Sequence, residues 1–206
     1  MGDYYALLSE PRRPWIDVEQ LKKSFIKLST ELHPDRFHGC SPEEKRAAQE
    51  RYTEINSAYQ CLLQPRERLA HLLELESGKK PTAIQTAPAT LMNLFLEVGE
   101  LCREVDRFLE EKRAARSPLL QVSLFEHGQG LADKINLLQQ RLRHLAAENE
   151  SGLGKHNLIW EKAPPVGDPR RAAALPLREL EEYYRALSYI SRWSGQLQER
   201  LVQLAL

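Results

Sequence analysis

Residues 32–37 read Leu-His-Pro-Asp-Arg-Phe, and the tripeptide His33-Pro34-Asp35 inside this stretch is the most informative feature of the sequence. Pro34 is expected to end the preceding helix, because its ring clashes with the previous helical turn and moves His33 away from helical dihedral angles. An imidazole and a carboxylate would then lie in a stiff loop. The Asp35 carboxylate can accept a bidentate hydrogen bond from an arginine, which gives a protein interface directional recognition.

Two amphipathic segments flank this loop. Before it, Asp17 is expected to cap a helix with one apolar stripe, composed of Val18, Leu21, Phe25, Leu28 and Leu32. After it, Ser41, Pro42 and Glu44 are typical of a helix start with a capping box. The stripe of this second helix consists of Ala48, Tyr52, Ile55, Tyr59 and Leu62. Two matching stripes joined by a short loop predict an antiparallel helical hairpin.

The rest of the chain is also predicted to be helical, which makes the fold all-α. Short helices are expected at 4–8 and 66–76, and the residues Gly78, Pro81 and Pro88 indicate a linker at 77–88. Three further apolar stripes predict a three-helix bundle, with helices at 91–109, at 131–145 and from 177 onward. Gly128 and Gly130 are expected to interrupt the second of these helices. The predicted domains are therefore residues 1–76 and residues 89–206, the latter with an irregular insertion at about 150–175.

The composition indicates an ordinary globular protein. Lysine plus arginine and aspartate plus glutamate are equal at 29 each, which leaves no overall basic footprint for nucleic acid. Cys40, Cys61 and Cys102 are widely spaced and odd in number, so a reducing compartment is expected. The first residues lack the pattern of a secretory signal, and no apolar run reaches membrane-spanning length. We therefore expect a cytoplasmic bacterial protein with no membrane partner.

The loop and its two helices resemble a J-domain, the module that switches on ATP hydrolysis in DnaK-type chaperones. The resemblance implies that Asp35 pairs with a chaperone arginine while His33 and Pro34 position the loop. It also implies that the basic face of the first hairpin helix docks on an acidic chaperone surface, with the residues Lys22, Lys23, Lys27 and Phe25. Ile26 and Glu31 stand where J-domains usually carry basic residues, which weakens this positive face. Taken alone, three lysines on a helix are more often only a solvated face.

The remainder of the chain resembles the HscB type of J-domain protein, a co-chaperone of iron–sulfur cluster assembly. The resemblance is carried by residues 64–75, by Leu91-Met92 with Phe95 and Leu101, and by the closing helix. It implies a DnaK/HscA-type chaperone and an IscU-like scaffold protein as partners. The scaffold would bind an apolar patch composed of Leu91, Met92, Phe95 and Leu96. The alternative is that these residues form the core of the bundle. Val98-Gly99 departs from the Arg-Glu pair that is typical of the family.

Other classes of function find less support in the sequence. His33, Asp35, His38 and Cys40 are close together, but no oxyanion or phosphate loop accompanies them, so we expect no catalytic residues. A zinc site here lacks a fourth ligand and the usual spacing, so neither a metal nor another cofactor is expected. Two interaction functions stay open. One is a J-domain adaptor for a client outside iron–sulfur assembly. The other is a helical adaptor that no longer stimulates ATP hydrolysis, which the intact His33-Pro34-Asp35 tripeptide disfavours.

Overall fold

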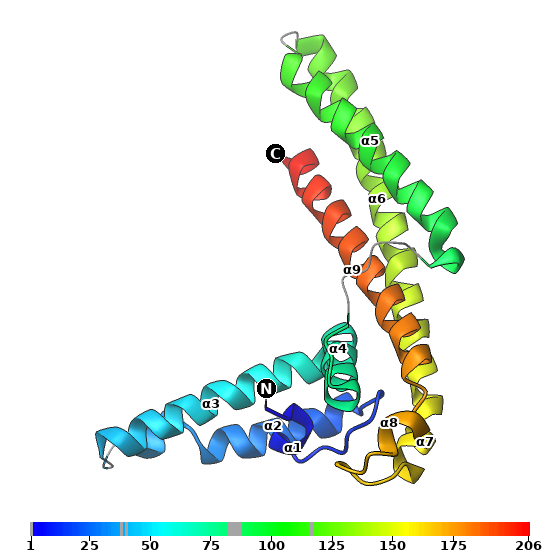
Figure 1. Cartoon of the computed structure of the whole chain (residues 1–206). Coiled ribbons are helices and arrows are strands. Elements are labelled where there is room, and N and C mark those ends of the chain that lie inside the picture. The colour runs from blue at the N-terminus through cyan, green and yellow to red at the C-terminus, as the bar shows by residue number, and fades with distance from the viewer. Residues whose placement is uncertain (1, 38, 40, 82–87, 116–117) are drawn as a thin grey trace. The chain divides into compact units, whose positions relative to one another are not determined.

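The computed structural model describes residues 2–37, 39, 41–81, 88–115 and 118–206, except for the side chains of residues 34–35 and 118–123. All regular secondary structure in these ranges is α-helix or 3-10 helix, which confirms the all-α prediction (Figure 1). The described chain groups into two compact units. One comprises residues 1–82 with 150–184, and the other comprises residues 83–149 with 185–206.

The first unit contains the predicted hairpin. Helices α2 (Val18–Glu31) and α3 (Pro42–Leu63) lie side by side, with α1 (Tyr4–Leu7) and α4 (Pro65–Ser77) packed at one end (Figure 1). Both predicted caps are confirmed. The side chain of Asp17 accepts hydrogen bonds from the backbone N–H groups of Glu19 and Gln20, and Ser41 and Glu44 form the capping box. The core of this part consists of Tyr5, Leu8, Ile16, Leu21, Ala48, Ile55, Ala58, Leu62, Leu69, Leu72 and Leu73.

Residues 150–184 differ from the predicted irregular insertion in the bundle domain. They group with residues 1–82, and they contain the 3-10 helix Gly154–His156 and the short helices α7 (Asn157–Lys162) and α8 (Arg171–Ala174). Polar contacts explain the grouping. The side-chain amide of Asn157 accepts a hydrogen bond from the backbone N–H of Trp15 at 3.1 Å and donates one to the Trp15 carbonyl at 2.9 Å. This one side chain therefore satisfies both backbone groups of a residue 142 positions away.

Two ion pairs attach the same segment to α4. The buried guanidinium of Arg68 donates to the carbonyls of Pro14 and Leu62 and to the Glu150 carboxylate. The guanidinium of Arg171 donates to both carboxylate oxygens of Glu76, each at 2.8 Å. Buried charges are tolerated when they are paired and hydrogen-bonded in this way.

The second unit is a bundle of three helices, α5 (Met92–Ala114), α6 (Pro118–Leu153) and α9 (Leu177–Ala205), with the 3-10 turn Ala89–Leu91 before α5 (Figure 1). Its buried core draws on all three helices and includes Val98, Val105, Leu131, Leu142, Trp193 and Leu197. The predicted break near Gly128 and Gly130 is wrong, because α6 is continuous from Pro118 to Leu153. A β-carbon at Gly128 would lie 3.0 Å from the ring of Phe108, so this glycine serves close packing of α5 on α6.

Candidate functional site

The His-Pro-Asp stretch lies between α2 and α3. Helix α2 ends at Glu31, and residues Pro34–Phe37 form a 3-10 turn in which the Arg36 N–H donates to the His33 carbonyl at 3.0 Å. The exposed ring of His33 packs edge-on against Tyr52 of α3, with 6.0 Å between the ring centroids. The side chains of Pro34 and Asp35 are outside the described residues, as are His38 and Cys40. The imidazole is thus held at the open end of the hairpin by a contact with the second helix.

The predicted basic face of α2 is exposed at each of its lysines, Lys22, Lys23 and Lys27. Phe25 takes a different role, because its partly buried ring stacks on Tyr59 of α3 with 4.2 Å between centroids and 16° between the ring planes. Phe25 therefore holds α2 against α3, and the three exposed lysines lie off this packed face of the helix. The lysines and the turn Pro34–Phe37 lie on one hairpin, and their use as a docking surface stays a prediction.

The four residues of the predicted scaffold patch divide into two groups. Leu91 is only 5% exposed and belongs to the core of the bundle. Met92, Phe95 and Leu96 are exposed on the first turns of α5, and the ring of Phe95 lies 6.4 Å from that of Trp193 on α9. Leu91 is therefore not available for a partner, and the exposed patch consists of Met92, Phe95 and Leu96.

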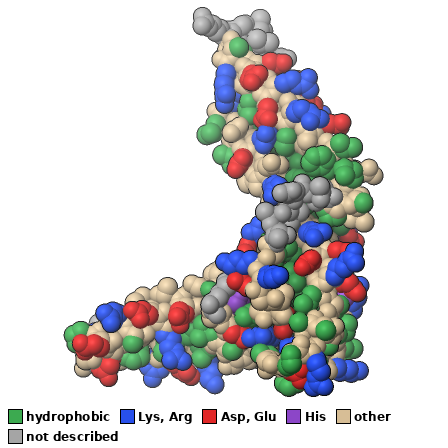
Figure 2. All heavy atoms as spheres, in the orientation of Figure 1, with side chains coloured by type: hydrophobic (Ala, Val, Ile, Leu, Met, Phe, Trp, Pro, Cys, Tyr) green, Lys and Arg blue, Asp and Glu red, His purple; other side chains and the backbone are tan. Residues whose placement is uncertain are grey.

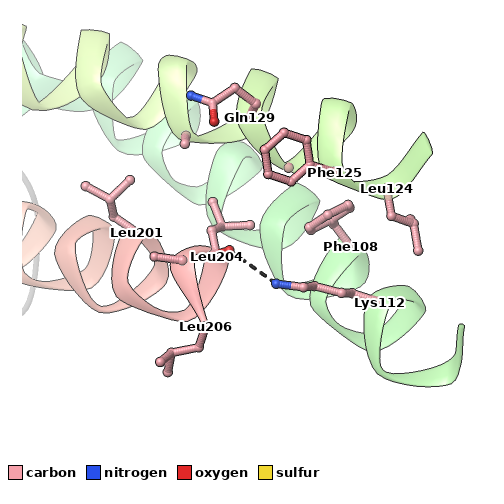
Figure 3. Close-up of a pocket in the computed structure, with 11 residues that line it drawn as sticks. Phe108, Lys112, Leu124, Phe125, Gln129, Leu201, Leu204 and Leu206 are labelled. Carbon is pink, nitrogen blue, oxygen red and sulfur yellow. Dashed lines mark hydrogen bonds between the residues drawn. The ribbon is translucent and has the colours of Figure 1, made fainter. Parts of the chain in front are cut away.

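An apolar cavity of about 580 Å³ lies at the end of the bundle where α9 stops (Figure 3). Figure 3 shows Phe108, Phe125 and Leu204 around it, and the ammonium group of Lys112 donates to the Leu204 carbonyl at 3.2 Å. The side chains of the described lining residues are mostly apolar, with Lys112 and Gln129 as the polar ones. No group of three or more metal-ligating side chains gathers anywhere among the described residues.

Known proteins are similar to this chain both in the hairpin region and over most of its length. The family model of the DnaJ domain matches residues 3–71. The co-chaperone protein HscB homolog of an Azoarcus species is 32% identical over 151 residues, which cover 73% of this chain and 74% of that protein. The chain belongs to the HscB co-chaperone family. It is therefore a J-domain co-chaperone of the HscB type, as the sequence predicts.

The same fold occurs in solved HscB structures. The chaperone HscB from Vibrio cholerae is 21% identical and superimposes with a TM-score of 0.50, over 96% of each chain. The human co-chaperone protein HscB is 19% identical with a TM-score of 0.52, and the match covers 97% of this chain and 82% of the human one. Within the described part of this HscB-family chain, none of the helices is long and apolar enough to cross a bilayer.

Sequence reasoning missed the residues that attach 150–184 to the hairpin unit. Asn157, Glu150 and Arg171 contact partners that are 142, 82 and 95 positions away, respectively. The only sequence signal was the basic pair Arg170-Arg171 inside a segment rich in proline and glycine. These two arginines have opposite environments, since Arg170 is exposed beside Asp168 and Arg171 is buried against Glu76.

Proposed function

We propose that this chain stimulates ATP hydrolysis by a DnaK/HscA-type chaperone and delivers an IscU-like iron–sulfur scaffold protein to it. The observation that carries the proposal is the combination on one chain of a J-domain hairpin and an HscB-type bundle with an exposed apolar patch. Joining the two surfaces raises the effective concentration of the scaffold beside the chaperone. The activity belongs to cluster assembly and transfer, and we place it in the bacterial cytoplasm.

The hairpin contributes recognition rather than catalysis. Lys22, Lys23 and Lys27 attract an acidic surface of the chaperone and fix the orientation of α2 on it. The loop then contacts the chaperone, where Asp35 accepts a bidentate bond from an arginine and His33 is oriented by Tyr52. The hydrolytic groups belong to the chaperone, and this chain supplies none.

The bundle captures the scaffold through Met92, Phe95 and Leu96. A flexible methionine beside larger apolar side chains suits an adaptable protein interface. Phe95 is the expected anchor, because its contact with Trp193 holds the ring in place before the partner binds. Truncation of such an anchor is expected to weaken scaffold binding by roughly tenfold or more.

The test is single-turnover ATP hydrolysis by the chaperone of the same organism, with and without this protein and the scaffold. We expect synergistic stimulation, which Asp35→Asn abolishes and Phe95→Ser reduces to the level reached without scaffold. Val202→Ser is the matched control on α9, because Val202 is similarly exposed at 51% and lies outside the patch. No stimulation of either a DnaK or an HscA chaperone would contradict the proposal.

A J-domain adaptor for a different client is the second candidate function. It is favoured by Val98-Gly99 on α5, which replaces the charged pair typical of HscB proteins, and by residues 150–175. In the same assay, stimulation that does not respond to the scaffold would support this candidate and exclude the iron–sulfur client.

A further inference from the structure

The outward face of α2 combines apolar and basic side chains. Ile26 is 51% exposed, and Val18 is exposed as well. Val18, Lys22 and Ile26 follow one another at intervals of four residues, so they share one stripe of the helix surface. Lys23 and Lys27 form the neighbouring stripe with the same spacing. Figure 2 shows hydrophobic, basic and acidic side chains interspersed over the surface that α2 and α3 form.

Two hydroxyl groups near Ile26 are directed to the helix backbone. The side chains of Ser29 and Thr30 both donate hydrogen bonds to the Ile26 carbonyl, at 3.1 Å and 2.7 Å. Such bonds between a hydroxyl and a carbonyl of the preceding turn use the hydroxyl proton within the helix. Neither hydroxyl is then an available donor for a partner.

Ile26 has no evident structural task in the hairpin. The core contacts of α2 come from Leu21, which is fully buried, and from Phe25, which stacks on Tyr59. The lysines beside Ile26 are also uncommitted, since none of them has an ion-pair partner in the described part of the chain. An exposed isoleucine amid unpaired lysines matches a partner surface with an apolar pocket and carboxylates around it.

We propose that Ile26 is a specificity-determining residue of the chaperone interface. It occupies an apolar pocket on the DnaK/HscA-type chaperone, while Lys22, Lys23 and Lys27 meet carboxylates at the rim of that pocket. The chaperone is the expected partner because Ile26 adjoins the proposed chaperone-binding residues: it lies between these lysines and only seven residues from His33. The inference rests on the proposed stimulation of the chaperone. It implies that the docking surface of the partner chaperone contains an apolar pocket and is not acidic throughout.

The experiment measures chaperone ATP hydrolysis against the concentration of the full-length protein. Ile26→Ala is expected to raise the half-saturating concentration about fivefold to tenfold, with the maximal rate unchanged. Ile26→Val, which keeps most of the apolar contact, should stay within about twofold of the wild type. Val202→Ala on α9 is the matched control with the same exposure, and it should leave the titration unchanged.

Salt and charge separate the apolar contact from the basic ones. The effect of Ile26→Ala should persist as salt rises from about 0.05 M to 0.3 M, whereas the effect of Lys22→Ala should shrink because charges are screened. Ile26→Lys should weaken the interaction at least as much as Ile26→Ala. A tighter interaction with Ile26→Lys, or an unchanged titration with Ile26→Ala, would overturn the inference while leaving the proposed function intact. Absence of stimulation by the wild-type protein would instead refute both.

Discussion

The ion pair between Glu76 and Arg171 offers the sharpest test of how residues 150–184 are held. The side chains of Glu76 and Arg171 are 2% and 9% exposed, and the guanidinium donates to both carboxylate oxygens and to the Pro164 carbonyl. The hydrogen bonds to Glu76 raise the pKa of Arg171 above its ordinary value, so this side chain stays charged. Removing one partner therefore leaves an uncompensated buried charge.

The change Glu76→Ala is expected to lower the free energy of unfolding by about 3–5 kcal/mol, the usual cost of breaking a buried pair. Replacing both charges by apolar residues, as in Glu76→Leu with Arg171→Met, should restore stability to about the wild-type value or above it. For a chain of this length, the single change corresponds to a fall in melting temperature of roughly 6–20 °C.

The assay is urea denaturation followed by circular dichroism, with the midpoint and slope fitted for each variant. Glu50→Ala is the control, because Glu50 forms an exposed pair with Arg46 on α3 and its loss should cost less than about 0.5 kcal/mol. A loss below about 1 kcal/mol for Glu76→Ala would refute the argument, since it would mean that Arg171 is not buried against α4. A double variant as unstable as the single one would refute the charge explanation.

Two further predictions concern the bundle and the pH dependence of stability. Gly128→Val should destabilise the protein by about 1–3 kcal/mol, because its side chain would overlap Phe108, whereas Gly130→Ala, with open space around it, should stabilise α6 by up to about 1 kcal/mol; urea denaturation of both variants measures the contrast. Burial lowers the pKa of His71, whose Nε2 accepts a hydrogen bond from the Tyr4 N–H at 3.1 Å. The unfolded chain therefore binds a proton at His71 more tightly than the folded chain does. The contribution of neutral His71 to the free energy of unfolding is complete above the unfolded pKa of about 6.5, and it is lost at lower pH with a slope of at most about 1.4 kcal/mol per pH unit. His71→Gln should reduce the change in the free energy of unfolding between about pH 7 and pH 5, as measured by urea denaturation at each pH. An unchanged pH dependence would contradict the assignment to His71.

The features that the sequence predicts well are local ones. The caps at Asp17 and at Ser41 depend on residues two or three positions apart, so the pattern contains all the information that they need. Gly128 was misinterpreted because its role depends on Phe108, twenty residues earlier on another helix. Helix propensity alone disfavours a glycine there, and close packing of the two helices outweighs that preference.

Leu91 illustrates a different kind of error. Its spacing of seven residues to Val98 places it on the apolar stripe of α5, and the structure buries both residues in the core. The resemblance to HscB proteins instead suggested a contact with the scaffold. Periodicity was the better guide here, because burial in a bundle follows the helical repeat while an interface depends on a partner. Met92 and Leu96 lie off that stripe and are exposed, whereas Phe95 lies on it and is exposed all the same at 46%. The proposed binding patch therefore keeps Met92, Phe95 and Leu96.

The limits of the compact unit that contains the J-domain could not be predicted from the sequence, because the contacts that complete this unit come from far along the chain. Arg68 requires Glu150, Trp15 is bonded to Asn157, and Glu76 requires Arg171. Helices α6 and α9 each contribute residues to both compact units. A fragment that ends at residue 76 would keep the hairpin and the His-Pro-Asp loop, but it would lose the partners of two buried charged side chains. Such a fragment is a different molecule from the J-domain of the intact chain, so chaperone stimulation is best measured on the whole protein.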